Sequence, residues 1–224
     1  MATEFAHVSV VVPMLDEASG IGATLAALAP LRHGGGEVIV VDGGSTDASI
    51  EIARPLADRV ISSPRGRATQ MNAGAAIARG RLLCFVHADT LMSARAVEML
   101  RDVDGWGRFE VRLSGRGALL GVIGWMMSRR SCLTGIATGD QCLFVARELF
   151  DTVGGFPEQP LMEDIEISKR LRRIVWPRCL SAPVVTDSRR WRRRGVVRTI
   201  LLMWWLRWAY AVGVSPTRLA EWYR

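Results

Sequence analysis

The chain has 224 residues, of which 49% are hydrophobic and 23% are charged. This composition is typical of one globular domain and excludes a disordered or collagen-like chain. The net charge of +7 is unevenly spread: residues 165–224 carry 14 basic and 3 acidic side chains, whereas residues 1–164 carry 15 and 19. An acidic partner is therefore expected at the C-terminal quarter.

Four cysteines lie far apart in the sequence, at Cys84, Cys132, Cys142 and Cys179, without the spacing of a zinc site. Cys84 falls in an apolar run and is expected to be a buried thiol. Nothing in the cysteine pattern indicates an oxidising compartment, and the N-terminal stretch does not have the pattern of a signal peptide. We expect a cytoplasmic protein, with attachment to the inner face of the membrane as an open alternative.

Short apolar runs alternate with helical spacing along the first part of the chain. Strands are expected at 8–12, 38–41, 60–61 and 82–86, and helices at 21–31, 48–57 and 68–79. This alternation predicts an α/β fold with a mostly parallel central sheet flanked by helices. The second half is less regular, with strands expected at 109–113 and 141–145 and helices at 121–127 and 163–173.

Ligands of parallel α/β sheets bind beyond the carboxyl ends of the strands, and Asp42 directly follows the second strand. Its carboxylate can accept hydrogen bonds from a sugar hydroxyl or a base N–H. Gly43 allows a ligand to approach the backbone closely. Ser45 or Thr46 is expected to cap the next helix. The alternative interpretation is a capped loop that binds no ligand.

His87, Ala88 and Asp89 follow the fourth strand. Residues i and i+2 of a strand point to the same side, so His87 and Asp89 can face one ligand. A carboxylate with a second polar group suits Mg²⁺ or Mn²⁺ that bridges phosphate oxygens. The alternative is a structural histidine beside an aspartate that caps a helix.

Glu163 and Asp164 begin a predicted helix. Two adjacent carboxylates raise the pKa of one of them, which favours a general base near neutral pH. Their alternative role is to complement the helix dipole. Arg65, Arg67 and Asn72 lie at another helix start and suit a diphosphate, with a solvated basic loop as the alternative.

Six motifs in register resemble the family 2 glycosyltransferases, which have the GT-A fold. They are VVPMLDEA (11–18), VDGGSTDAS (41–49), GRATQMNAGA (66–75), HADT (87–90), GDQCLFVARELFDTVGGFPE (139–158) and MEDIEISKRLRR (162–173). The short length, HADT and SRRWRRRG (188–195) are similar to a small branch, the selenodomain/radical-SAM-associated transferase 2 group.

This resemblance implies that a UDP- or GDP-sugar is the donor. Its nucleotide pocket would be lined by Pro13 and Glu17, and its base or ribose would be held by Asp42 with Gly43. The ribose and diphosphate would lie near Arg67 and Asn72.

The resemblance also implies a metal site and a base. The segment from His87 through Ala88 to Asp89 matches the family's metal-binding D-x-D, with Asp89 as the ligand of Mn²⁺ or Mg²⁺ and a histidine in place of the first carboxylate. Asp164 matches the base that deprotonates the acceptor hydroxyl, with Glu163 beside it. The implied reaction is one displacement with inversion at the anomeric carbon.

Residues 196–214 form a 19-residue stretch with 15 apolar side chains. It belongs to a basic, Trp-rich helical appendage (191–224) that follows the expected transferase domain (1–190). Three alternatives are open: a helix packed on the core or on a second subunit, a helix in the membrane interface, or a membrane span. An interfacial helix would suit a lipid-linked acceptor.

Two rival classes remain at this point. A nucleotidyltransferase would carry a Gly-rich loop with Arg and Lys after the first strand, where this chain has Pro-Met-Leu-Asp-Glu. A non-enzymatic membrane or nucleic-acid binder would use the basic run 189–194, but it would give the strand-end carboxylates no role. We expect no nucleic-acid partner.

Overall fold

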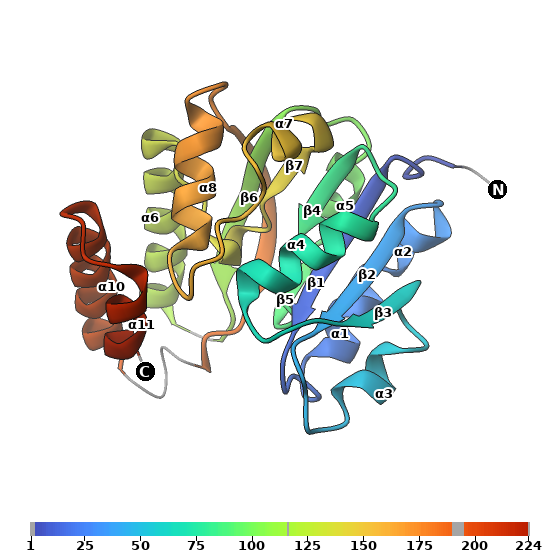
Figure 1. Ribbon diagram of the computed structural model, residues 1–224, viewed down its shortest axis with the longest axis horizontal. Helices are drawn as coiled ribbons and strands as arrows, with labels where there is room; N and C mark the ends of the chain where they lie inside the picture. Colours follow the sequence, from blue (N-terminus) through green and yellow to red (C-terminus); the bar gives the residue numbers. More distant parts are fainter. Residues whose placement is uncertain (1–2, 116, 190–194, 224) are drawn as a thin grey trace.

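The computed structural model describes residues 3–115, 117–189 and 195–223. Within these residues the strands form an eight-stranded sheet in the order β3-β2-β1-β4-β7-β6-β8-β5, with helices on both faces (Figure 1). The strands are β1 (Val8–Met14), β2 (Glu37–Asp42), β3 (Arg59–Ser62), β4 (Leu82–Phe85), β5 (Thr90–Met92), β6 (Trp106–Leu113), β7 (Phe144–Ala146) and β8 (Arg178–Thr186).

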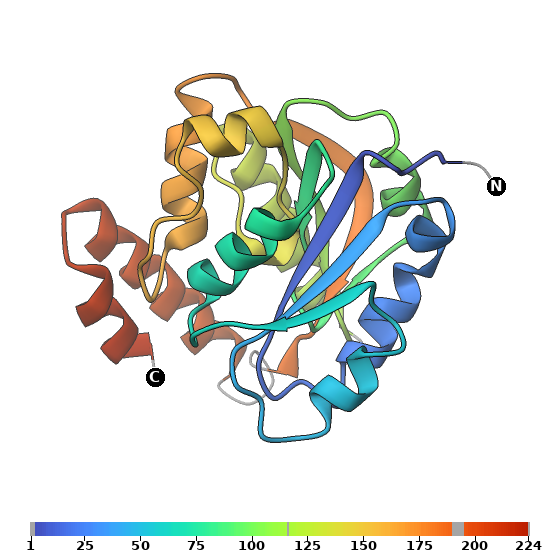
Figure 2. The ribbon, with the colours of Figure 1, turned by 45° about the vertical axis from the view of Figure 1, so that its right-hand side comes forward.

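The helices differ widely in length. They are α1 (Ile21–Ala27), α2 (Ala29–His33), α3 (Ser49–Ala53), α4 (Arg67–Ile77), α5 (Ala94–Met99), α6 (Ala118–Thr134), α7 (Arg147–Thr152), α8 (Glu163–Arg172), α10 (Val196–Ala211) and α11 (Pro216–Tyr223), with a 3₁₀ turn at Gly139–Gln141. Figure 2 shows that α10 and α11 lie at the outer edge of the molecule, away from β1 to β3.

The sheet is mostly parallel, as predicted. Strand β1 pairs in parallel with β2 and β4, and β2 with β3, while β6 is parallel to β8. Strand β7 runs antiparallel between β4 and β6, and β5 is antiparallel to β8. Because β1, β2 and β4 are parallel neighbours, the segments that follow them meet at one edge of the sheet.

Alternate residues of the central strands face two different cores. Val10 and Val12 of β1 pack with helices α1, α2, α3 and α5 on one face. Val11 packs with α4, α7 and α8 on the other face. Strands covered on both faces have to be continuously apolar, which is why the run around β1 shows no polar alternation.

Several element boundaries differ from the prediction. The helix expected at 21–31 is divided at Leu28, because Pro30 begins a new helix, α2. The helix expected at 48–57 ends at Ala53, just before Pro55. The strand expected at 141–145 begins at Phe144, since the 3₁₀ turn occupies the preceding residues. Helix α6 runs longer than expected, to a left-handed Gly135.

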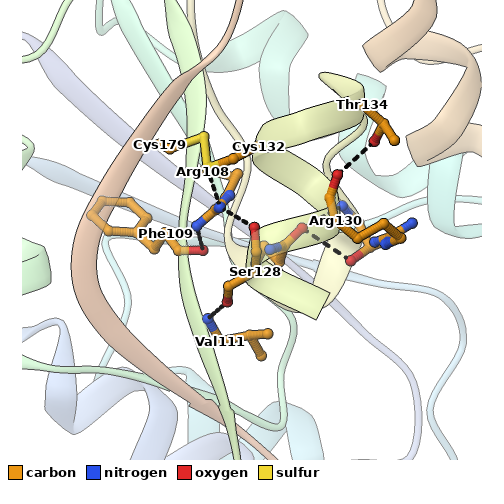
Figure 3. The surroundings of a disulfide bond; sticks show 10 residues. Arg108, Phe109, Val111, Ser128, Arg130, Cys132, Thr134 and Cys179 are labelled. Carbon is orange, nitrogen blue, oxygen red and sulfur yellow. Dashed lines mark hydrogen bonds between the residues drawn. A yellow bond between two sulfur atoms is a disulfide. The ribbon is translucent and has the colours of Figure 1, made fainter. Parts of the chain in front are cut away.

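Cys132 of α6 and Cys179 of β8 form a disulfide, which their spacing in the sequence did not indicate (Figure 3). Next to it, the buried Arg108 donates a hydrogen bond of 2.5 Å to the carbonyl oxygen of Ser128 in α6. Burial lowers the pKa of Arg108 to about 10. Cys84 is a buried thiol, as expected, and burial raises its pKa to about 12. Helix α6 is thus fastened to the sheet by a covalent and a polar contact.

The apolar stretch near the C-terminus forms α10, which packs on the core together with α11. Their buried residues Leu206, Ala209 and Leu219 contact residues 161, 162 and 165 at the start of α8. In the part of the chain that the structure describes, no helix is long and apolar enough to cross a membrane. The expected domain boundary at 190/191 falls outside the described residues.

Candidate functional site

Asp42 lies at the end of β2 and organises the loop that follows it. The side chain is 2% exposed and accepts hydrogen bonds from the backbone N–H groups of Gly44 (2.9 Å) and Ser45 (3.1 Å). Gly44 has a φ of +94°, which suits glycine. The carboxylate thus holds the loop in a fixed conformation at the strand end.

The loops after β1 and β2 are joined to each other. Asp16 donates its backbone N–H to the hydroxyl of Ser45 (2.9 Å) and accepts from the N–H of Thr46 (2.8 Å). Consequently neither Ser45 nor Thr46 caps α3, and the prediction that one of them would is wrong. Ala48 is the N-cap residue, and its side chain makes no capping bond.

Gln70 of α4 ties both loops to the helix that carries Arg67. Its side-chain amide donates 2.8 Å hydrogen bonds to the carbonyl oxygens of Met14 and Val41. A Cβ at Gly43 would lie 3.0 Å from this amide, so a glycine fits the space. Pro13 lies within β1 and is buried, with Val41 as its partner in β2. These contacts fix the two loops beside which the nucleotide is predicted to bind.

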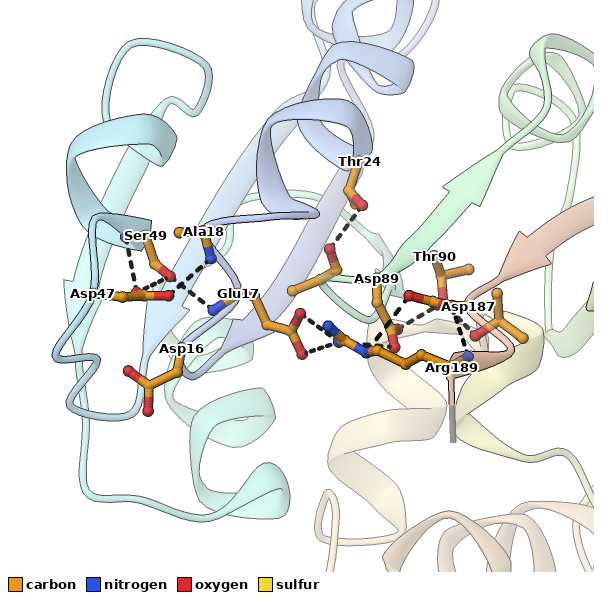
Figure 4. Close-up of polar contacts among 12 residues, drawn as sticks. Asp16, Glu17, Ala18, Thr24, Asp47, Ser49, Asp89, Thr90, Asp187 and Arg189 are labelled. Atoms are coloured by element: carbon orange, nitrogen blue, oxygen red, sulfur yellow. Dashed lines mark hydrogen bonds and ion pairs between the residues drawn. The ribbon is translucent and has the colours of Figure 1, made fainter. Parts of the chain in front are cut away.

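Glu17 and Asp89, both predicted site residues, meet at one guanidinium (Figure 4). Arg189 contacts both carboxylate oxygens of Glu17, at 2.6 and 2.5 Å, and lies 3.5 Å from Asp89. It also lies 3.6 Å from the carboxylate of Asp187, which follows β8. Three carboxylates therefore surround one cation, and this group has a formal charge of −2.

The residues around Asp89 fit a divalent ion that arrives with a diphosphate. Within the described residues, no group of three His, Cys, Asp or Glu side chains could hold a metal ion. Mg²⁺ sites commonly use one or two carboxylates and complete their shell with substrate phosphates and water. Asp89 and Asp187, which lie 3.5 and 3.6 Å from the Arg189 guanidinium, are the two carboxylates that would hold such an ion.

Asp164 lies in a second polar cluster, at the start of α8. Its carboxylate accepts hydrogen bonds from the N–H groups of Gly139 (3.0 Å) and Ile165 (2.8 Å). Burial raises the pKa of Asp164 to about 7, and the negative charge of Glu163 acts in the same direction, whereas the Gly139 bond and Arg67 oppose it. This pKa suits a general base at neutral pH.

Arg67 and Glu163 connect the second cluster to α4. Arg67 Nη1 lies 3.2 Å from the Glu163 carboxylate, which is almost fully buried. Arg130 of α6 also lies near this cluster. Burial lowers the pKa of the Arg130 guanidinium, and the negative charges of Asp164 and Asp140 oppose that shift. Two arginines thus lie near three carboxylates, one of which is the candidate base Asp164 itself.

His87 links the two clusters. Its Nδ1 lies 3.8 Å from the carboxylate of Asp140, and its ring packs so closely on Gly139 that a Cβ there would lie 2.4 Å away. Because Gly139 also bonds to Asp164, the segment 87–89 and the start of α8 face each other across the 3₁₀ turn. The backbone of Ala88, in turn, is fixed by the hydroxyl of Thr24.

Asn72 has a different place from the one expected. Its amide nitrogen donates to the carbonyl oxygen of Phe156 (2.8 Å), and its amide oxygen accepts from the Phe156 N–H (2.9 Å). The side chain therefore holds the loop before α8 and is not presented to the sheet edge. Its expected contact with the ribose or diphosphate stays a prediction.

The sequence analysis did not place three residues in the site: Asp187, Arg130 and Arg189, the last of which it treated only as part of the basic run 189–194. Asp187 and Arg189 follow β8, which was not predicted as a strand; the rule that ligands bind beyond strand ends would have found them there. Arg130 is an arginine inside an apolar helix, and nothing in its local sequence marks it.

Part of the chain is similar to known proteins. Residues 9–105 match the family model described as glycosyl transferase family 2. A PGL/p-HBAD biosynthesis glycosyltransferase from Mycobacterium bovis is 35% identical over 88 residues, which cover 36% of this chain and 34% of that protein. A beta-monoglucosyldiacylglycerol synthase from Nostoc is 24% identical over 96% of this chain and 50% of its own length. The chain thus spans a third to a half of these curated relatives.

Solved structures share the fold. A mannosyltransferase from Pyrobaculum calidifontis, in complex with GDP-Man and Mn²⁺, has a TM-score of 0.64 and 22% identity, covering 96% of this chain and 68% of that one. S. aureus TarS 1-349, in complex with UDP-GlcNAc, has a TM-score of 0.65 and 21% identity, covering 81% and 58%. The chain shares the GT-A fold of these transferases.

Proposed function

We propose that the protein transfers a sugar from a UDP- or GDP-sugar to an acceptor hydroxyl, with inversion at the anomeric carbon. The main support for this proposal is the position of Asp164. This carboxyl group has a pKa of about 7, and it faces the segment 87–89 across the 3₁₀ turn. The GDP-Man and UDP-GlcNAc complexes of the two structural relatives support a nucleotide-sugar donor.

The proposal gives each residue a role at its place in the fold. Asp42 and the joined loops after β1 and β2 hold the nucleotide, with Pro13, Glu17 and Gly43 at its edge. Arg67 lies at the start of α4, where a cation favours the departing diphosphate. Mn²⁺ or Mg²⁺ held by Asp89 would supply further positive charge to that diphosphate when it is bound.

The reaction is one displacement. The acceptor oxygen forms a bond to the anomeric carbon, the bond from that carbon to the diphosphate oxygen breaks, and the nucleoside diphosphate leaves with the bonding pair. Asp164 takes the proton of the acceptor hydroxyl. Burial, and then the neighbouring Glu163, raise the pKa of Asp164, and Glu163 is held in place by Arg67.

A thermal-shift experiment tests the donor part of this proposal. UDP and GDP are added to the wild type and to Asp89→Ala, each with Mn²⁺ or with EDTA. A ligand that binds the native state raises the melting temperature. We expect Mn²⁺ to enhance the shift for one nucleotide in the wild type but not in the variant. If each nucleotide gives the same shift in both proteins, with Mn²⁺ and with EDTA, the metal role of Asp89 is contradicted.

The same material tests the rival classes. A nucleotidyltransferase would release pyrophosphate from a nucleoside triphosphate, whereas the proposed enzyme would slowly hydrolyse a nucleotide sugar and release the diphosphate. A non-enzymatic nucleic-acid binder would do neither and would shift DNA in a salt-dependent manner.

A further inference from the structure

Helix α10 exposes an apolar stripe that the core does not explain. Its members recur at helical spacing and are each 59–67% exposed: Val197, Leu201, Trp204, Trp208 and Val212. The opposite side of the helix, with Leu206 and Ala209, packs on the start of α8. A helix that is apolar all round is expected in a core or a membrane environment, so the outer stripe requires an apolar neighbour.

Helix α6 exposes a second stripe of the same kind. It consists of Leu119, Val122, Trp125, Met126 and Leu133, which are 49–75% exposed. The two helices are neighbours, because Val196 and Ile200 of α10 pack against Leu120 and Ile123 of α6. Both lie at the end of the molecule opposite β3 and α3 (Figure 1). We call the two stripes together the α6–α10 face.

The charges of the two helices indicate the nature of the partner. Arg129 of α6 and Arg198 of α10 are exposed, and the sequences of the two helices contain neither Asp nor Glu. The Arg129 guanidinium lies 5.9 Å from the centre of the exposed Trp125 ring. Tryptophan next to arginine is the composition of a protein surface at the boundary between lipid headgroups and acyl chains.

The face is also hollowed. A groove of about 830 Å³ lies between α10 and α11, and its lining includes Leu201, Trp205 and Trp222 with Arg198 at its edge. The two tryptophan rings contact each other in a tilted arrangement, at a centroid distance of 4.4 Å. An apolar groove with one guanidinium can take part of an acyl chain while the cation contacts a headgroup phosphate.

We propose that the α6–α10 face docks on an anionic lipid bilayer. A second copy of the chain would bring its exposed Arg129 and Arg198 to the same residues of the first, with no Asp or Glu on either helix to offset them, which disfavours a symmetric dimer through this face. An anionic bilayer matches both the apolar stripes and the positive charge.

This docking also specifies an acceptor class, and that part rests on the proposed function. The inner side of α10 packs on Met162 and Ile165, which flank Glu163 and Asp164. A bilayer bound to the outer side would therefore lie one helix away from the candidate base. The acceptor is then a hydroxyl carried by a membrane lipid.

Vesicle flotation tests the face. Wild-type protein is mixed with vesicles of phosphatidylcholine and phosphatidylglycerol in a ratio of about two to one, or of phosphatidylcholine alone. The test variants are Trp204→Ser/Trp208→Ser for the stripe and Arg129→Glu/Arg198→Glu for the charge. The matched controls are Leu91→Ser and Arg95→Glu, which alter exposed residues on β5 and α5.

We expect wild type and both controls to float with the anionic vesicles, and each test variant to lose binding by roughly tenfold or more. Melting temperatures and the nucleotide-induced shift are measured on the same samples, so that a misfolded variant or a failed donor site is distinguished from a failed face. Three outcomes would overturn the proposal: no wild-type binding to anionic vesicles, equal loss in the controls, or a dimer in sedimentation that Trp204→Ser/Trp208→Ser dissolves.

Discussion

Arg189 contacts both carboxylate oxygens of Glu17, although 172 residues separate the two in the sequence. The contact joins the loop after β1 to the segment after β8, at opposite ends of the chain order but at the same edge of the sheet. It places a fixed positive charge next to Asp89. The chain thus provides its own cation at the position where the metal is proposed to bind.

This arrangement makes Arg189 a competitor of the divalent ion. In Arg189→Ala the carboxylates of Glu17, Asp89 and Asp187 lose their shared cation. We expect the affinity for Mn²⁺ alone, measured by calorimetry, to rise by roughly fivefold, since a unit charge pair at 4 Å is worth about 1 kcal/mol even in water. Arg95→Ala on the exposed side of α5 should leave it unchanged. A weaker Mn²⁺ affinity in Arg189→Ala would show that Arg189 supports the ion.

Asp42→Asn tests the nucleotide side. The change keeps the shape of the side chain but removes the charge that accepts from the N–H groups of Gly44 and Ser45. Hydrogen bonds to a charged group contribute about 1.5–3 kcal/mol. We expect weaker nucleotide binding together with a lower melting temperature, and unchanged Mn²⁺ affinity. Normal nucleotide affinity at a lowered melting temperature would reduce Asp42 to a structural role.

Asp164→Asn separates chemistry from binding. The amide keeps the size of the side chain but cannot take a proton, so transfer should fall by roughly 10²–10⁴-fold at nearly unchanged donor affinity. In the wild type, transfer should rise with pH through about 7, because Asp164 acts when ionised. A transfer rate within about threefold of the wild type would refute the assignment, and Glu163→Gln would be tested next.

The same carboxyl group predicts a stability effect. Its folded pKa lies above the ordinary value, so the folded state holds the proton more tightly than the unfolded state. The resulting contribution to the free energy of unfolding is present at low pH and is lost as the pH rises through about 7. Denaturation by urea at about pH 5.5 and about pH 8 should therefore show a smaller loss of stability in Asp164→Asn than in the wild type.

Arg67→Met tests the electrostatic link between α4 and α8. The positive charge of Arg67 lowers the pKa of Asp164, so its removal should shift the rising limb of the pH–rate profile to higher pH. Arg65→Met, two residues earlier in the exposed loop, is the control and should leave the limb in place. If the rising limb of the pH–rate profile stays in place in Arg67→Met, a group other than Asp164 determines that limb.

The sequence was sufficient where one rule applied locally. Asp42, His87 and Asp89 were singled out because each follows an apolar run, and the structure has β2 and β4 in those places. Asp164 was singled out because two carboxylates stand side by side at a helix start, and α8 begins there. Their functional roles stay predictions. The capping role of Ser45 and Thr46 was wrong because Asp16, thirty residues away, competes for their hydrogen bonds. Local rules do not include such a partner.

The features that the sequence did not predict depend on tertiary contacts. Strand β8 is interrupted by Pro183 and only partly buried, so it does not have the apolar pattern of β1 or β2, and Asp187 and Arg189 remained hidden with it. The disulfide between Cys132 and Cys179 joins elements that are 47 residues apart. No local spacing encodes either relationship.

The reciprocal hydrogen bonds between Asn72 and Phe156 have a consequence for protein engineering. Together with the Arg67–Glu163 pair, they make α4 a common support for the donor loops and for the segment that carries Asp164. A chimaera that exchanges residues 9–105 with those of another transferase would therefore replace one half of each contact. Donor preference should be transferable between relatives only when positions 67 and 72 are exchanged together with their partners at 156 and 163.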